Sequence, residues 1–153
     1  MAFGLAVTVL GASSLAACGT EPLGDNPVPP DPSIDEDFFF CRIQPEIIAT
    51  HNCASGGAGE GGSCHTARSA LRLDPAGESD PPPACDEEGV LLEAPPESYE
   101  NNLESVRFTI RAEPLSSPFY QRPVGIASHP RVIFEPSSTE ADLIVEWLTR
   151  GAP

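Results

Sequence analysis

Residues 53–65 read Cys-Ala-Ser-Gly-Gly-Ala-Gly-Glu-Gly-Gly-Ser-Cys-His, and this segment decides what kind of core the chain can build. Ten residues separate Cys53 from Cys64; five of them are glycine, and the others are small except for Glu60. Because glycine adopts many backbone conformations, such a loop can bulge outward and still bring its ends together. The two sulfur atoms can therefore meet, with His65 directly after the second one.

The cysteines leave two interpretations open. Once Cys18 is assigned to an export signal, Cys41, Cys53, Cys64 and Cys85 remain, an even number suited to an oxidising compartment. They form either two disulfides and no other site, or one disulfide and a pair with another use. A zinc site that includes the Cys53–His65 cluster and a fourth ligand is a further alternative.

The position of His65 directly after Cys64 favours a role for Cys53 and Cys64 other than a second disulfide. A Cys followed directly by His ends the C-x-x-C-H signature of c-type haem attachment, in which two thioether bonds hold the haem and the His binds the iron. Ten residues here replace the usual two, which is a departure from that signature. The assignment of this motif to haem attachment therefore depends in part on the segments around it.

Three helices are predicted around this motif. Ile43, Ile47 and Ile48 follow helical spacing, and Pro45 suits the first turn of a helix that leads into Cys53. A second helix is predicted from Ser98 to before Pro114, and a third behind a capping box formed by Ser137 and Glu140. The expected core positions of the two later helices are Tyr99, Leu103, Val106, Ile110, Ala141, Ile144, Trp147 and Leu148, and Gly151 suits the last C-terminal cap.

The order of motifs resembles that of secreted cytochrome c-like lipoproteins of the myxobacterial type. It runs from the aromatic segment at 38–40 and its helix through the cysteine motif to Leu-Arg-Leu-Asp at 71–74. A serine-proline loop at 114–118, Ser-His-Pro-Arg at 128–131 and Glu-Trp-Leu-Thr-Arg-Gly-Ala at 146–152 complete it. In that family the two cysteines are often more than two residues apart. The resemblance implies a mainly α, cytochrome c-like domain over 37–152, with about three short helices and long irregular loops.

The resemblance also implies roles for single residues. Cys53 and Cys64 would form the thioether bonds to haem c, and His65 would be the proximal ligand of its iron. His129, in a loop before the last helix, is the expected distal ligand, or else an exposed loop histidine. Met1 leaves with the export signal, and His51 lies too near Cys53 to cross the iron. Ligation by two histidines gives a lower reduction potential than ligation by His and Met.

With this assignment, Cys41 and Cys85 are expected to form a disulfide that ties the leading helix to the acidic, proline-rich loop at 78–88. Such a staple suits a chain with 18 prolines and 13 glycines, whose apolar core is small. Arg68 and Arg72 either meet the haem propionates or face solvent.

The start of the chain has the pattern of an export signal. Residues 2–17 are uncharged and mostly apolar or small, and the run is too short to span a bilayer as a helix. It ends in Leu-Ala-Ala-Cys-Gly at 15–19, which resembles the bacterial lipoprotein signal and makes Cys18 the expected lipidation site. No Lys or Arg precedes the run, and an ordinary cleaved signal is the alternative. A Pro-rich disordered tether is expected at 18–36, so that the domain sits in the cell envelope, on the periplasmic face or at the outer membrane.

The charge balance excludes nucleic acid as a partner. The chain has 23 acidic residues and 8 basic ones, all Arg, for a net charge of -15. The acidity either keeps the protein soluble or steers it toward a basic redox partner. Hydrolase, metalloprotease and phosphate-loop motifs are absent from the sequence. We therefore expect an electron-transfer protein rather than an enzyme; the alternative is a haem-free, disulfide-stapled envelope lipoprotein that serves as a structural or interaction module.

Overall fold

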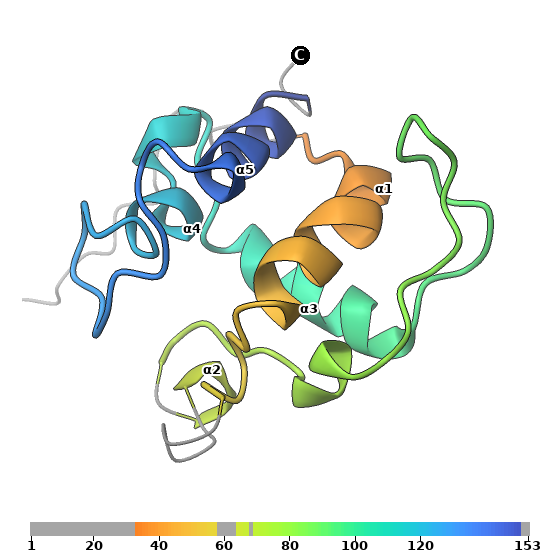
Figure 1. Cartoon of the computed structure of the whole chain (residues 1–153), viewed down its shortest axis with the longest axis horizontal. Coiled ribbons are helices and arrows are strands. Elements are labelled where there is room, and N and C mark those ends of the chain that lie inside the picture. Colours follow the sequence, from red (N-terminus) through yellow and green to blue (C-terminus); the bar gives the residue numbers. More distant parts are fainter. Residues whose placement is uncertain (1–32, 58–63, 68, 151–153) are drawn as a thin grey trace, which may run out of the picture. The chain divides into compact units, whose positions relative to one another are not determined.

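A computed structural model of the chain describes residues 33–57, 64–67 and 69–150, which belong to one unit spanning residues 31–153 (Figure 1). This part of the chain is helical and contains no strand, and an isolated bridge joins Cys85 to Leu91. The prediction of a small, mainly α domain is confirmed. The export signal with Cys18, most of the tether, the centre of the glycine-rich insert, Arg68 and Gly151 lie outside the described residues.

The first long helix runs continuously through α1 (Glu36–Phe38) and η1 (Phe39–Ala49), and η1 has π-type hydrogen bonding. It begins where the side chain of Asp35 accepts a hydrogen bond of 3.0 Å from the backbone N–H of Phe38. The prediction that Pro45 stands in the first turn is therefore wrong, since Pro45 lies inside the helix. Burying the three phenylalanines at 38–40 contributes about 1.5–3 kcal/mol each. That gain outweighs the roughly 3 kcal/mol cost of an internal proline.

The two later helices were predicted well in their buried faces. Helix α3 (Glu97–Arg107) and helix α5 (Thr139–Arg150) bury most of the positions expected, although Ile110 is buried beyond the end of α3 and Leu148 is only partly buried. The predicted capping box is displaced by one residue. Ser138, not Ser137, caps α5, because its hydroxyl accepts a hydrogen bond of 3.2 Å from the Ala141 N–H.

Single-turn helices interrupt the loops between the long ones. They are α2 (Cys64–Ala67), η2 (Pro75–Glu78), η3 (Pro114–Ser116) and α4 (Pro118–Gln121). Proline stands at the first turn of three of them and pre-sets the backbone angle that a helix start needs. These short elements hold the long loops in defined places, and the site described below lies among them.

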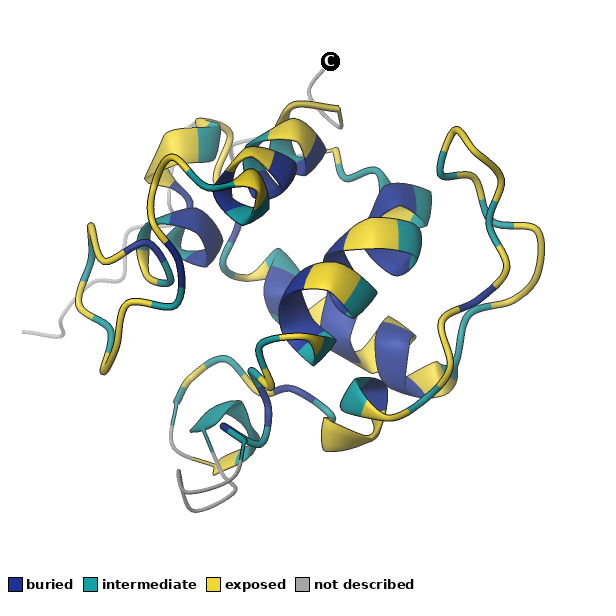
Figure 2. Cartoon of the chain, viewed as in Figure 1, coloured by how far each residue is buried: buried dark blue, intermediate teal, exposed yellow. Residues whose placement is uncertain are grey.

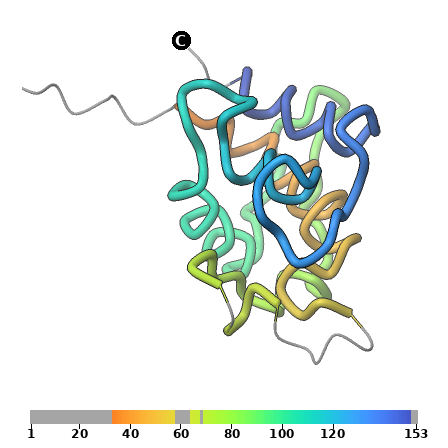
Figure 3. Tube along the Cα trace, turned by 90° about the vertical axis from the view of Figure 1, so that its left-hand side faces the viewer, coloured from red at the N-terminus to blue at the C-terminus, as the bar shows by residue number. Residues whose placement is uncertain are grey.

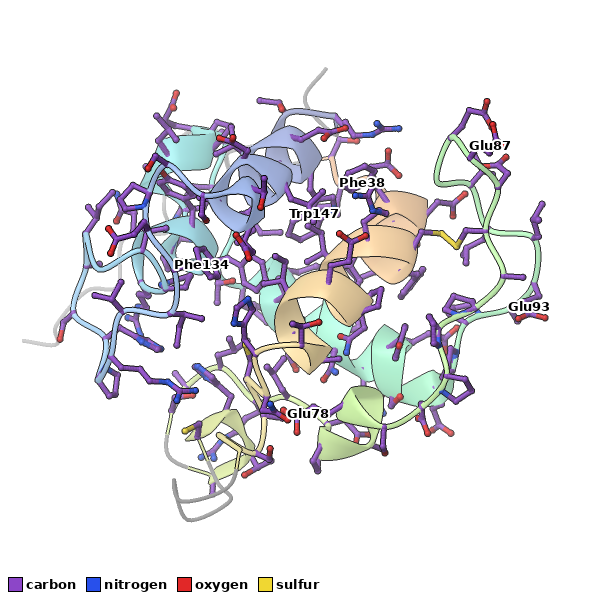
Figure 4. The ribbon with its side chains drawn as sticks, in the orientation of Figure 1. Phe38, Glu78, Glu87, Glu93, Phe134 and Trp147 are labelled. Atoms are coloured by element: carbon purple, nitrogen blue, oxygen red, sulfur yellow. A yellow bond between two sulfur atoms is a disulfide. The ribbon has the colours of Figure 1, made fainter. Side chains whose placement is uncertain are left out.

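The core lies where η1, α3 and α5 face one another, which Figure 2 shows as dark blue ribbon. At its centre the Trp147 ring lies 5.3 Å from the ring of Phe39 and 5.7 Å from that of Phe119, measured between centroids. Its indole N–H donates a hydrogen bond of 2.9 Å to the backbone carbonyl of Asp35. Trp147 thus connects α5 to the start of the first helix and to α4 (Figure 4).

A buried amide pair ties η1, η2 and α3 together. Gln44 Nε2 donates to the Gly77 carbonyl at 2.9 Å, and Asn102 Nδ2 donates to Gln44 Oε1 at 3.1 Å. Asn102 Oδ1 in turn accepts from the backbone N–H of Asp74 at 2.6 Å. A Cβ at Gly77 would lie only 2.6 Å from Asn102 Nδ2, so the close approach of these elements requires glycine there. This network fixes the chain that follows the cysteine motif against the core.

A disulfide joins Cys41 of η1 to Cys85 in the long acidic loop, and it is the pair that was expected (Figure 4). The loop makes few other connections to the helix; the N–H of Leu91 donates to Asp37 Oδ2 at 3.4 Å. The disulfide is the covalent link between this loop and η1, and Ser98 and Tyr99 of α3 also donate hydrogen bonds to Asp80 near the start of the loop.

Replacing both Cys41 and Cys85 with serine is expected to lower the free energy of unfolding by about 2–4 kcal/mol, because the crosslink restricts the unfolded chain across 44 residues. Urea unfolding followed by circular dichroism measures this. Wild-type protein treated with a thiol-free reductant is the matched control and should lose the same amount. An unchanged free energy in both samples would contradict the structural role of the disulfide.

Candidate functional site

A cavity of about 770 Å³ opens between the end of η1, α2 with the residues after it, the end of α3, α4 and the loop at 122–134. Its volume falls in the range of about 300–1,000 Å³ typical of sites for small organic ligands. Much of its wall is apolar, and the apolar side chains include Ile47, Ile48, Leu73, Phe119 and Phe134. The cavity is therefore suited to a ligand with a large apolar body.

The loop between α4 and α5 forms one wall of this cavity. Its Phe134 ring lies 5.4 Å from the ring of His51 at the end of η1, measured between centroids. This contact brings the loop back to the end of η1 (Figure 3). His51 itself is not among the described residues that line the cavity.

The two candidate ligands, His65 and His129, lie beside each other in the cavity wall. Their ring centroids are 6.0 Å apart and their ring planes differ by only 19°. His65 comes from α2, and His129 comes from the loop before α5. The fold thus brings together two histidines that are far apart in the sequence.

Hydrogen bonds fix the tautomer of His65. Its Nδ1 lies 2.7 Å from Ser69 Oγ, and Ser69 Oγ donates its single hydrogen to the Leu71 carbonyl at 2.6 Å. Ser69 can therefore only accept, so the His65 Nδ1–H is the donor. The neutral ring then has its lone pair on Nε2, the atom that a metal would use.

His129 is held in the same way. Its Nδ1 lies 2.6 Å from the backbone carbonyl of Arg131, which can only accept a hydrogen bond. In the neutral ring the lone pair is again on Nε2. Both histidines are thus oriented by an acceptor on Nδ1, the arrangement usual for histidines that bind metals.

Burial lowers the pKa of His65 below its usual value, and the positive charges of the nearby His129 and Arg122 act in the same direction. A hydrogen bond to the Leu71 carbonyl as acceptor opposes the shift. The His65 ring is therefore neutral at pH 7. A neutral imidazole keeps the lone pair that metal ligation requires.

Cys53 and Cys64 also line the cavity, and both are free thiols. The backbone N–H of His65 donates to the Cys53 carbonyl at 3.2 Å and to the Ala54 carbonyl at 2.9 Å. The two ends of the glycine-rich insert therefore meet, as its composition predicted. The alternative of a second disulfide between these cysteines is not the arrangement in the structure.

Glu78 holds the Cys53 end of the insert. Its Oε1 accepts from the N–H groups of Ala54 at 2.7 Å and Ser55 at 3.0 Å, and Figure 4 shows Glu78 beside the chain that leaves η1. Burial raises the pKa of the Cys53 thiol to about 12, and the negative charge of Glu78 adds to this shift. Cys53 is therefore a protonated thiol at neutral pH.

Four arginines line the cavity, namely Arg72, Arg111, Arg122 and Arg131. Arg72 was named from the sequence, whereas Arg111 and Arg122 were not, because no local pattern places them near the cysteine motif. In the described part of the chain no group of three or more His, Cys, Asp or Glu side chains is arranged to hold a metal ion. A zinc site of four protein ligands thus has no counterpart there. A macrocycle that supplies its own equatorial ligands needs only two axial side chains.

Comparison with protein-family models, curated proteins and solved structures finds no match to this chain. Within the described residues, no helix has the length and apolar character needed to cross a membrane. The chemistry of the cavity therefore carries the functional assignment.

Proposed function

We propose that this protein is a haem-binding electron-transfer protein of the c type. Cys53 and Cys64 would attach the haem, and His65 and His129 would hold its iron. The observation that carries the proposal is the pair of nearly parallel imidazoles, 6.0 Å apart, each with Nδ1 held by an acceptor.

The separation of the two rings fits a shared metal. Imidazole nitrogens bind metals at about 2 Å, so two axial imidazoles on one ion have their centroids roughly 6 Å apart. Rings that both contain the axis through the metal can also be parallel, as these nearly are. The 6.0 Å separation of His65 and His129 is thus of the size that two imidazoles on one ion require.

The cavity fits the rest of the group. Haem is a flat and largely apolar macrocycle, and the wall offers Ile47, Ile48, Leu73, Phe119 and Phe134. Cys53 and Cys64 stand in the same wall, next to the proximal candidate His65. Attachment through both sulfurs requires the insert to close, and the hydrogen bonds from the His65 N–H to the backbone at 53–54 support this.

When bound, haem would supply a one-electron couple at its iron. The residues of this chain would set its environment. Ser69 and the Arg131 carbonyl hold the two imidazoles in position and raise their basicity, which favours the oxidised state. The apolar side chains exclude water, and two histidines give a lower potential than His with Met.

The envelope location belongs to the same proposal. Lipidation at Cys18 and the Pro-rich segment at 18–36 would tether the domain, and the net charge of -15 would favour a basic redox partner. Charge steering implies an association rate that falls as salt rises.

The test is expression of the full chain together with haem-maturation enzymes, followed by a pyridine haemochrome spectrum of the denatured protein. We expect haem that stays with the polypeptide after denaturation. Changing either Cys53 or Cys64 to serine should leave one thioether bond and shift the haemochrome band, and changing both should abolish covalent attachment. A chain without haem, in which Cys53 and Cys64 are joined by a disulfide, would overturn the proposal in favour of the haem-free lipoprotein.

A further inference from the structure

The arginines of this acidic protein fall into two groups with different surroundings. Away from the cavity, Arg42 pairs with Glu46, Arg107 pairs with Glu36 and Glu104, and Arg150 pairs with Asp35 and Glu146. Arg72, Arg111 and Arg122 line the cavity, and none of these three forms an ion pair with any carboxylate in the described ranges.

This difference is unexpected for the composition. With 23 acidic residues and 8 basic ones, each arginine has many potential partners of opposite charge. Of the described carboxylates, only Glu104 lines the cavity, and it is already paired with Arg107 at 3.2 Å. The cavity therefore collects positive charge in a chain whose net charge is -15.

The guanidinium groups at the cavity are positioned but have donors left over. Arg72 Nη1 donates to the Thr66 carbonyl at 3.1 Å, and Arg111 Nη1 donates to the Ile110 carbonyl at 2.8 Å. A guanidinium has five N–H donors in a planar fork, so most of them remain for a ligand. Arg122 stands at the end of α4 and lines the same cavity as His65.

We infer that Arg72, Arg111 and Arg122 form a carboxylate-binding rim, so that the cavity selects a planar apolar ligand that carries carboxylates on its edge. This inference rests on the proposed function, in which those carboxylates are the haem propionates. Guanidinium groups bind carboxylates through paired, charge-assisted hydrogen bonds. The apolar wall would then hold the macrocycle while the rim sets its orientation.

The test uses metal-free protoporphyrin IX, which removes any contribution from iron ligation. Its affinity for the purified full chain is compared with that of its dimethyl ester, by porphyrin fluorescence. We expect the diacid to bind about tenfold more tightly than the ester. The double variant Arg111→Gln/Arg122→Gln should weaken diacid binding by about tenfold and leave ester binding unchanged.

Arg42→Gln is the matched control, because Arg42 is paired with Glu46 and does not line the cavity. It should change neither affinity. Arg111 and Arg122, the two rim arginines that the double variant changes, are exposed, so the unfolding midpoint of that variant should match that of the wild type. The inference of a carboxylate-binding rim would be overturned if the chain bound the diacid and the ester with equal affinity, or if it bound neither porphyrin. It would also be overturned if Arg42→Gln weakened diacid binding as much as the double variant does. If the chain binds the diacid more tightly than the ester but acquires no covalent haem on expression with the maturation enzymes, the inference of the rim stands and the proposed function is overturned.

Discussion

Replacing His129 with alanine is expected to convert the haem of the loaded protein from a low-spin form with two axial histidines to a high-spin form that binds carbon monoxide freely. In the proposed site His129 would be one of the two imidazoles that hold the iron, so its loss would leave the iron short of one ligand. His65→Ala should have a larger effect, since it would remove the proposed ligand next to Cys64, the proposed attachment residue. Absorption spectra of the ferric and ferrous protein, with and without carbon monoxide, measure both changes.

The chain offers a matched control for this experiment. His51 is the third histidine, and it packs against Phe134 outside the cavity lining. His51→Phe keeps a ring against Phe134, and so keeps the contact that places the His129 loop, but it cannot bind a metal. It should leave the spin state unchanged. His129→Met should restore a low-spin spectrum and raise the reduction potential, because methionine ligation favours the reduced iron. An unaltered spectrum in His129→Ala, or an identical change in His51→Phe, would rule out His129 as the distal ligand.

Replacing Trp147 with alanine is expected to lower the free energy of unfolding by about 3–5 kcal/mol, the range for removing a large aromatic side chain from a core. Trp147 is 1% exposed, packs against Phe39 and Phe119, and donates to the Asp35 carbonyl. Since it is the sole tryptophan of the chain, unfolding in urea has to be followed by circular dichroism rather than by indole fluorescence.

Trp147→Phe separates the two contributions of this side chain. Phenylalanine keeps much of the contact with Phe39 and Phe119 but loses the hydrogen bond to the Asp35 carbonyl. That carbonyl still accepts from the Phe39 N–H, so the loss should cost about 0.5–1.5 kcal/mol. We expect Trp147→Phe to be clearly more stable than Trp147→Ala. Two variants of equal stability would mean that the hydrogen bond, not the packing, dominates at this position.

Local patterns predicted the helices correctly where one apolar face decides the outcome. Tyr99, Leu103 and Val106 in α3 repeat at helical spacing and are all buried. The same reasoning failed at the ends of helices, where several residues compete for one role. Ser137 and Ser138 can both cap α5, and only the path of the preceding loop selects Ser138.

Pro45 misled the prediction for a related reason. A proline is compatible with a first turn, so the sequence pattern favoured a helix start there. The helix instead begins at Glu36, because the phenylalanines at 38–40, which precede Pro45, are buried in the core. The Phe39 ring packs against Trp147 of α5. A long-range packing gain exceeded a local preference.

The sequence alone determined the local chemistry of this protein. Cys64 and His65 are neighbours in any fold, and glycine in the insert lets the chain return to Cys53. The tertiary structure alone decided which distant groups share the cavity with them. His129 reaches His65 because Phe134 packs on His51 and carries the loop back to the end of η1. Arg111 and Arg122 line the wall because α3 and α4 end beside it. The spacing of apolar residues in the sequence indicates which residues share one face of a helix. The contacts of His129, Arg111 and Arg122 with the cavity depend instead on how whole helices and loops pack against one another.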